Sequence, residues 1–383
     1  LSHTLITGNS RKKGKFENLF LEGRPPLSVG VTNSGHLMGG TQVAFTDVLG
    51  DQQFSFYVAS ISQYRTLAAS YANLSRRFQF AAQGFSQDQF FYGFGRGTFF
   101  DPAFGGFMNP DDAMAVRTMR GGTVFGIYPF SRYRRLTFSA GLLYNKERFN
   151  NPGMESMSQN FQDQQFGTRI FRDGAFTPFG VSFIQETTIF REFGPLSGNT
   201  VRLSYEMAPS VGPLLSRRTV DADARYYLRL GETGLLALRG RGFKSWGEFP
   251  DFLFFGGNSE MRGYEYLQFI GHEAFFMNAE LRFPLIEAML TPIGVLGGVR
   301  GTFFLDVGGA GLTGQPFTMF SRAPERVLPT IGYGYNPATN EYTPVFGEPT
   351  TVSGFRLVDG RASYGIGLQT SVIGIPLHFD WSW

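Results

Sequence analysis

The chain has 383 residues, a formal net charge of +3 and charged residues at only 17% of its positions, so it has no basic run long enough to indicate nucleic-acid binding. It contains no cysteine, which excludes a disulfide framework and thiol chemistry. No apolar run approaches the ~18 residues that a membrane-spanning helix needs, and no segment shows the apolar spacing of an amphipathic helix.

The N-terminal end carries little information about fold. The chain starts at Leu1 without an initiator methionine or a signal-peptide pattern, so we expect a processed product or a fragment. The basic cluster "SRKKGK" (Ser10 to Lys15) is interpreted as a solvated terminal segment.

Period-two alternation of apolar and polar residues recurs along the rest of the chain, and it predicts strands with one apolar face. In "LHFDWSW", Leu377, Phe379, Trp381 and Trp383 oppose three polar residues. The same pattern is clear in "RLTFSAGLLYN" (135–145), "VRLSYEM" (201–207) and "FFMNAELRF" (275–283).

Strands and connections follow a regular rhythm. We expect about fifteen strands, near 26–33, 39–48, 52–63, 66–75, 77–84, 114–128, 133–147, 174–190, 199–209, 219–230, 233–246, 274–284, 298–308, 362–371 and 376–383. Short turns alternate with long connections at 85–113, 148–173, 247–273 and 309–361, the last of which contains an ordered or semi-ordered surface loop at 313–350. A soluble sandwich has no reason to alternate in this way, whereas a transmembrane antiparallel β-barrel has short turns on one rim and long loops on the other.

The sequence offers only weak signals for a catalytic site or a metal site. The four histidines lie far apart, and there is no nucleophile elbow or zinc-protease motif. We interpret "GFGRG" (Gly93 to Gly97) as loop glycine rather than a phosphate loop, and "DPAFGGFMNPDD" (Asp101 to Asp112) as an acidic surface loop rather than a cation site. We therefore expect no enzyme activity, no catalytic residue, no metal and no cofactor.

One arginine is unusual. Arg262 lies in the long connection 247–273, while Glu280 and Asp306 lie on the polar faces of two consecutive predicted strands. If the connection folds back into the barrel, the planar guanidinium can bridge the two carboxylates, which a lysine cannot do. The alternative is three separate, solvated lumen charges.

Three motifs resemble the C-terminal barrel of the BamA/TamA superfamily, also called bacterial surface antigens. They are "MRGY" (Met261 to Tyr264) after a double glycine, "AELRFPL" (Ala279 to Leu285) and "FLDVG" (Phe304 to Gly308). The resemblance implies a sixteen-stranded barrel whose sixth external loop folds inward, with its arginine on a glutamate of strand twelve and an aspartate of strand thirteen. Carried over, this loop latch comprises Met261, Arg262, Gly263, Tyr264, Glu280, Asp306 and Gly308.

Two departures from the family pattern bear on function. The periplasmic POTRA modules of the family are not in this sequence, and "TDVLGDQQFSFYVAS" (46–60) resembles the barrels that follow a TolB-like β-propeller. The sequence also stops after the segments that resemble strands fourteen and fifteen. The sixteenth strand is therefore absent from this chain, supplied by a partner, or formed by "LHFDWSW" itself.

The resulting expectation is a periplasmic lead-in segment at 1–25 followed by a bacterial outer-membrane barrel at 26–383 with an inward-folded loop at 247–273. The resemblance implies a protein assembly or translocation factor that acts through a lateral seam between the first and last strands. Its partners would be the lipid bilayer and outer-membrane or secreted protein substrates. The alternatives are a non-insertase barrel that anchors or scaffolds envelope protein subunits and, less favoured because the loop would obstruct it, a solute pore.

Overall fold

The computed structural model describes residues 19–31, 37–61, 64–90, 112, 114–166, 172–191, 194–231, 233–266, 268–286, 289–291, 294–296, 298–314, 317–336, 341–372 and 375–383. The glycine loop at 93–97 and residues 101–111 of the acidic loop lie outside these ranges. No helix in the described part of the chain is long and apolar enough to cross a membrane.

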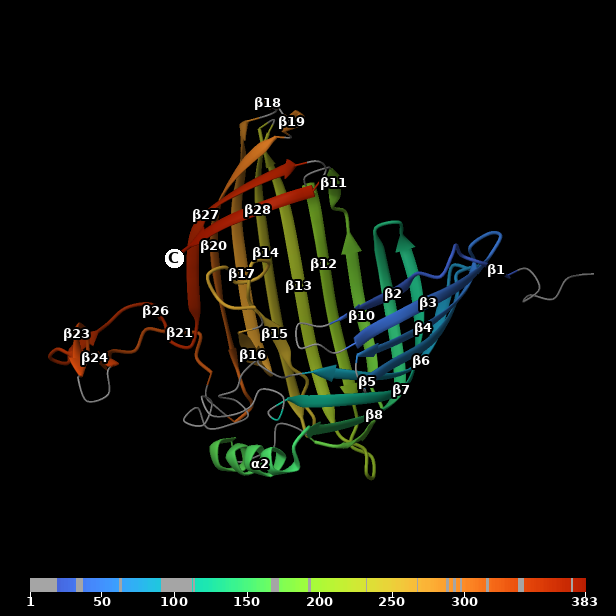
Figure 1. Ribbon diagram of the computed structural model, residues 1–383, viewed down its shortest axis with the longest axis horizontal. Helices are drawn as coiled ribbons and strands as arrows, with labels where there is room; N and C mark the ends of the chain where they lie inside the picture. Colours follow the sequence, from blue (N-terminus) through green and yellow to red (C-terminus); the bar gives the residue numbers. More distant parts are fainter. Residues whose placement is uncertain are drawn as a thin grey trace, which may run out of the picture.

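One antiparallel sheet of 18 strands forms the body of the protein (Figure 1). Its strands are β1 (Leu19–Leu21), β2 (Leu27–Val31), β3 (Leu37–Asp47), β4 (Gln52–Ile61), β5 (Tyr64–Asn73), β6 (Gln79–Phe90), β7 (Ala115–Ser131), β8 (Arg134–Phe149), β9 (Gly174–Phe176), β10 (Phe179–Glu186), β11 (Ile189–Arg191), β12 (Gly194–Ala208), β13 (Arg217–Leu230), β14 (Gly234–Gly247), β17 (Glu273–Ile286), β20 (Val299–Gly311), β27 (Arg361–Val372) and β28 (Ile375–Ser382). This confirms the all-β antiparallel fold expected from the alternation.

The 18 strands fill 15 positions in the sheet, because three short strands continue a neighbour along the same ladder. Both β1 and β2 pair with β3, both β9 and β10 pair with β8, and both β10 and β11 pair with β12. Each position pairs with the next one along the chain, so the sheet is a continuous meander from β2 to β28. The order agrees with the fifteen segments predicted from sequence.

The N-terminal strand extends the sheet further than expected. Leu19, Phe20 and Leu21 pair with Phe45, Thr46 and Asp47 of β3. These three residues fall within the segment 1–25 that the sequence analysis assigned to a periplasmic lead-in. Their apolar side chains extend the pattern of β2, which the intervening Gly23 and the two prolines at 25–26 interrupt.

The two ends of the sheet differ. At one end, hereafter the turn end, consecutive strands are joined by tight turns such as those after β7 and β13, and the small hairpin β18 (Met289–Thr291)–β19 (Gly294–Leu296) projects there. At the other, the loop end, lie the longer connections, with α2 (Pro152–Phe166) beneath the sheet in Figure 1.

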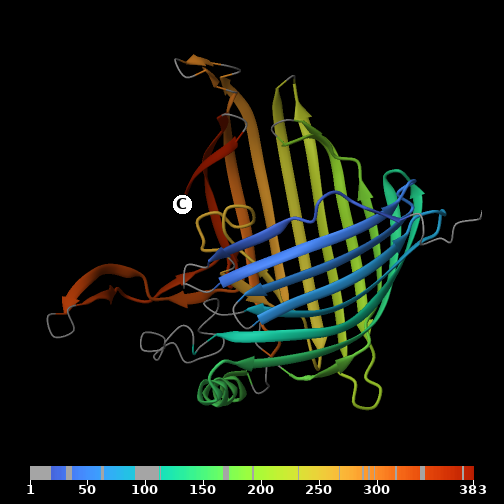
Figure 2. The same cartoon turned by 45° about the vertical axis from the view of Figure 1, so that its right-hand side comes forward.

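Two loop-end connections are more structured than the sequence indicated. Helix α2 was not expected because its buried positions are polar: Gln162 donates a hydrogen bond to Ser158 at 2.9 Å, so no apolar stripe marks the helix. Residues 317–336 and 341–359 form a hairpin of three successive ladders, which extends away from the sheet in Figures 1 and 2. Its strands are β21 (Phe320–Ser321), β22 (Glu325–Val327), β23 (Thr330–Asn336), β24 (Glu341–Phe346), β25 (Thr350–Val352) and β26 (Arg356–Leu357).

The sheet curls so that β2–β8 pass in front of the C-terminal strands in Figure 2, and its two faces differ in polarity. On the outer face, Phe303, Leu305 and Tyr364 are more than half exposed. On the inner, concave face, their neighbours Phe304 and Asp306 are buried. An apolar face of this extent is not stable in water but suits contact with lipid.

The edges of the sheet are β2 and β28. Among the described residues, β2 pairs only with β3, and β28 pairs only with β27. In an antiparallel meander, the first and fifteenth positions run in the same direction. These two edges therefore cannot form an antiparallel ladder with each other, and one further strand between them could pair antiparallel with both. All of the segment "LHFDWSW" except its last residue, Trp383, lies in β28, which occupies the fifteenth position.

Candidate functional site

The connection between β14 and β17 turns back onto the inner face of the sheet. Its stem is the hairpin β15 (Leu253–Phe255)–β16 (Phe269–Gly271). Beyond the stem, the Met261 N–H donates to the Gly257 carbonyl at 3.0 Å and closes a tight turn. Gly257 has φ +82°, a left-handed conformation that glycine adopts without steric cost. This turn presents Arg262 to β17 and β20.

Asp306 is the most completely buried charge of the site, with 0% exposure. Its Oδ2 accepts hydrogen bonds from the Arg262 backbone N–H at 3.1 Å and from Arg262 Nε at 2.8 Å. Its Oδ1 accepts from Arg262 Nη2 at 2.7 Å and from Asn278 Nδ2 at 2.9 Å. Four donors therefore compensate the desolvation of this carboxylate, and three of them come from one residue of the connection.

Glu280 holds the other side of the guanidinium. Its Oε1 lies 2.9 Å from Arg262 Nη1, and its Oε2 accepts hydrogen bonds from Arg282 at 2.8 and 2.6 Å. Burial by itself lowers the pKa of Arg262, but the hydrogen bonds to Asp306 and the charge of Glu280 outweigh it and raise the pKa above its ordinary value. Arg262 therefore stays charged.

An aromatic ring lies beneath the guanidinium. Arg262 Cζ lies 3.7 Å from the ring centroid of Phe304, close enough for a strong cation–π contact. The Phe304 ring in turn lies over Gly365 of β27, where a Cβ atom would come within 2.5 Å of it. Phe304 and Asp306 are on the same face of β20 because they are two residues apart.

The remaining residues of the predicted latch pack around this centre. Met261 is fully buried, and a Cβ at Gly308 would lie 3.0 Å from its sulfur. Gly263 has φ +85°, and a Cβ there would lie 2.9 Å from Ser382 Oγ of β28. The Tyr264 hydroxyl donates to the Ala362 carbonyl of β27 at 3.2 Å. The structure thus brings together all seven residues that the resemblance singled out.

Sequence reasoning missed two members of this centre. Asn278 bridges the connection and the sheet, because its Nδ2 also donates to the Glu260 carbonyl at 2.5 Å. Phe304 was part of a quoted motif but received no role. Both could have been found, since each lies two residues from a predicted site residue and therefore on the same face of its strand.

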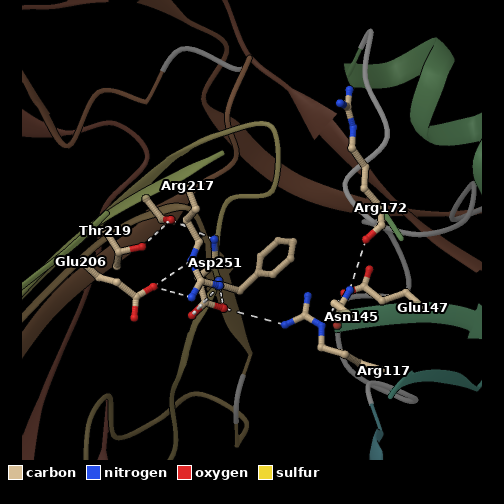
Figure 3. Close-up of polar contacts among 10 residues, drawn as sticks. Arg117, Asn145, Glu147, Arg172, Glu206, Arg217, Thr219 and Asp251 are labelled. Carbon is tan, nitrogen blue, oxygen red and sulfur yellow. Dashed lines mark hydrogen bonds and ion pairs between the residues drawn. The ribbon is translucent and has the colours of Figure 1, made fainter. Parts of the chain in front are cut away.

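A second ionic cluster lies at the start of the same connection, at the loop end (Figure 3). Asp251 lies 3.8 Å from Arg117 Nη1 of β7 and 3.9 Å from Arg217 Nη1 of β13. Arg117 also pairs with Glu147, and both side chains are 4% exposed. Arg217 Nε donates to Glu206 at 3.0 Å. One carboxylate thus links two strands that are four positions apart in the sheet.

Aromatic rings fill the space between these arginines. The guanidinium carbons of Arg117 and Arg217 lie 5.5 and 5.8 Å from the centroid of the Phe249 ring. Phe249 packs on Phe176 at 5.4 Å, and both are buried. No signal in the sequence marked this cluster, because its members come from six separate segments.

His272 lies beside this cluster, between β16 and β17. It is 3% exposed, its Nδ1 accepts from the Thr313 N–H at 3.0 Å, and its ring lies 4.4 Å from that of Phe252. Burial lowers the pKa of His272 from 6.5 to about 4. His272 is therefore neutral at pH 7. No group of metal-ligating side chains occurs among the residues that the structure describes.

Comparisons with known proteins agree with this architecture. The family model described as Omp85 superfamily domain matches residues 63–383. The crystal structure of BamA from Haemophilus ducreyi lacking POTRA domains 1–3 is similar, with a TM-score of 0.60 and 14% identity over 96% of this chain and 66% of that chain. No curated protein sequence matches this chain.

Weaker similarity extends to two further solved structures. CdiB from Acinetobacter baumannii has a TM-score of 0.41 and 13% identity over 93% of this chain and 54% of that chain. CdiB from Escherichia coli has a TM-score of 0.41 and 12% identity over 94% of this chain and 65% of that chain. The chain spans less than two thirds of the length of each of these three proteins.

Replacing Arg262 tests how much its ion pairs with Asp306 and Glu280 contribute to the stability of the protein. Arg262→Ala leaves the Asp306 carboxylate buried without its main donors, and breaking such a pair typically costs ~3–5 kcal/mol of unfolding free energy. We expect the folded band in semi-native electrophoresis to be lost at a clearly lower temperature. The temperature at which Arg262→Lys loses its folded band should lie between those of the wild type and Arg262→Ala, because an ammonium cannot bridge both carboxylates.

Arg241→Ala is the matched control. Arg241 pairs with Asp221 at 2.9 Å on the same inner face, and within the described structure it forms no hydrogen bond or ion pair with the connection. Equal loss of heat resistance in Arg241→Ala and Arg262→Ala would contradict a special contribution of Arg262.

The lowered pKa of His272 predicts that the stability of the protein depends on pH. Its pKa is lower in the folded protein than in the unfolded chain, so between pH 6.5 and about 4 the unfolded chain binds a proton that the folded protein does not. The free energy of unfolding should therefore fall as pH drops through this window, by about 1.4 kcal/mol per unit. We expect His272→Asn, which keeps an acceptor for Thr313, to flatten the fall in melting temperature between pH 7 and 5.

The exposed His378 supplies the control for this measurement. His378→Asn should leave the pH dependence as in the wild type. A wild-type melting temperature that does not change between pH 7 and 5 would show that His272 does not limit stability.

Proposed function

The chain belongs to the Omp85 superfamily and is an outer-membrane barrel protein, and from this we propose that it assembles or translocates other proteins at a lateral seam between β2 and β28. In this proposal the connection at 247–273 is a lumen loop, and the seven-residue centre around Arg262 is the latch that holds it.

The unpaired edges of the sheet carry the proposal. An edge strand presents a row of unsatisfied N–H and C=O groups, and each such group is costly in the hydrocarbon of a membrane. Because β2 and β28 run in the same direction, a strand inserted between them can satisfy both edges at once. A strand of a substrate protein has the required chemistry, and so does a further strand of this protein or of a partner.

The contacts of the loop tip support a link between the latch and the seam. The tip contacts β17 through Glu280, β20 through Asp306 and β27 through the Ala362 carbonyl. Its Gly263 lies beside β28, where an added Cβ would come within 2.9 Å of Ser382 Oγ. It therefore spans the last four positions of the sheet and ends on the strand that forms one side of the seam. We infer that the latch stiffens this side while β2 remains free to part from it.

The second candidate function is an anchor or scaffold for an envelope complex, without insertase activity. The hairpin β21–β26 favours it, because this arm extends away from the sheet and exposes Leu328, Ile331, Phe346 and Phe355 by more than half. An exposed apolar arm of this kind suits a protein contact.

Depletion separates the two candidates. If the protein is an assembly factor, its depletion should reduce the folded amounts of other outer-membrane proteins several-fold, measured by quantitative proteomics of purified outer membranes. Expression of the wild type or of Arg241→Ala should restore them, and Arg262→Ala should restore them less. Unchanged amounts of these proteins after depletion would contradict the assembly function and favour the scaffold function.

The orientation of the barrel is testable with single cysteines, since the chain has none of its own. Ile331 in the hairpin arm and Leu49 in the β3–β4 turn are both strongly exposed but lie at opposite ends of the sheet. We expect a membrane-impermeant maleimide to label Ile331→Cys on intact cells, and Leu49→Cys only after the outer membrane is permeabilised. The reverse pattern would invert the proposed orientation.

A further inference from the structure

A polar pocket of about 230 Å³ lies on the inner face of β13, β14 and β17, beside the tip of the connection. Its lining includes Arg225, Tyr227, Arg239, Ser259, Glu280 and Arg282. Three of these six side chains are guanidiniums, and only one is a carboxylate. The pocket adjoins the latch, because Glu280 belongs to both.

Guanidiniums outnumber carboxylates among the side chains that line this pocket. Arg225 and Arg239 share Asp223, whose Oδ2 lies 3.1 Å from each of their Nη2 atoms. Arg282 and Arg262 share Glu280. With Asp306 included, four guanidiniums face three carboxylates that are each already engaged, and Asp380 of β28 acts electrostatically on Arg262 from the far side of the latch.

Two buried polar atoms of the lining have no hydrogen-bond partner within the described structure. One is the Arg239 Nε–H, a donor, and the other is Asn278 Oδ1, an acceptor. The orientation of the Asn278 amide follows from its Nδ2, which donates to two acceptors. Asn278 is 8% exposed, so bulk water does not satisfy its oxygen.

This combination narrows the ligand. A free carboxylate or a phosphodiester supplies only acceptors and would leave Asn278 Oδ1 unmet. A polypeptide segment with an acidic side chain supplies the carboxylate for the guanidiniums and a backbone N–H for the amide oxygen. The position on the inner face, between the tip of the connection and the turn end, suits an extended chain more than a lipid headgroup.

We propose that this pocket binds an Asp or Glu side chain of an extended polypeptide that enters from the turn end. The inference rests on the proposed function and adds the substrate chemistry: an acidic segment is held beside the latch. A carboxylate that engages Arg282 competes with Glu280, and Glu280 in turn holds Arg262. Binding of the segment therefore draws Arg282 away from Glu280 and leaves the Glu280 carboxylate to Arg262 alone.

The test uses the purified chain in detergent micelles and fluorescein-labelled decapeptides of alternating Ser and Glu, Ser and Gln, or Ser and Lys, followed by fluorescence anisotropy. We expect the Glu peptide to bind at least tenfold more tightly than the Gln peptide, and the Lys peptide not to bind. Arg282→Gln should weaken binding of the Glu peptide about tenfold. Arg241→Gln removes the same charge from the same face outside the pocket and should leave the affinity unchanged.

Ser259→Trp provides a second variant, since it fills the pocket without changing its charge and leaves the Arg282–Glu280 pair intact. It should abolish binding while the heat resistance of the barrel is retained. Equal affinities for the Glu and Gln peptides, equal effects of Arg241→Gln and Arg282→Gln, or displacement of the peptide by millimolar inorganic phosphate would overturn the proposal. Because this assay needs no substrate assembly, it can fail while depletion still lowers other outer-membrane proteins, and the reverse also holds.

Discussion

The carboxylate of Asp306 has no exposed surface, and a buried charge persists only where donors replace the water that it has lost. Arg262 supplies three of its four donors, and Arg262 reaches it only if the connection between β14 and β17 folds onto the inner face. The position of this connection and the burial of Asp306 therefore depend on each other. Removing either partner leaves the other charge in a site that was built for a pair.

Small residues make room for this pair. Gly308 leaves space for the Met261 side chain, and Gly365 leaves space for the Phe304 ring on which the guanidinium rests. A methyl group at either position would meet side-chain or backbone atoms closer than 3.0 Å. Glycine at these strand positions weakens the local sheet but allows the loop tip to approach the backbone of β20 and β27.

The inner face carries three neighbouring arginine clusters, which differ in how far carboxylates neutralise the positive charge. At the loop end, Asp251 joins Arg117 and Arg217 around buried phenylalanine rings. At the centre, Asp306 and Glu280 saturate Arg262. Beside it, Arg225, Arg239 and Arg282 have fewer carboxylates than charges. The first two clusters hold the connection at its base and its tip, and the third is where an external anion gains most from binding.

The sequence by itself determined the outer and inner faces of the strands, and with them the fold class. Successive side chains of a strand point to opposite faces, so the alternation in 275–283 and 377–383 is a direct consequence of backbone geometry. It also placed Glu280 and Asp306 on one face, and the family motifs singled out Arg262 as their partner. Helix α2 escaped notice because its buried residues are polar, and the hairpin at 317–359 because its strands are short and interrupted.

Only the tertiary structure decided which side chains meet across the interior. Arg117 and Arg217 converge on Asp251 because the sheet curls, and this curvature sums small twists over many strands that no local pattern records. The unmatched atoms of Arg239 and Asn278, and the contact of Gly263 with β28, depend likewise on the path of one connection through the interior. Alternation fixes the direction of a side chain, whereas its partner is fixed by the curvature of the whole sheet.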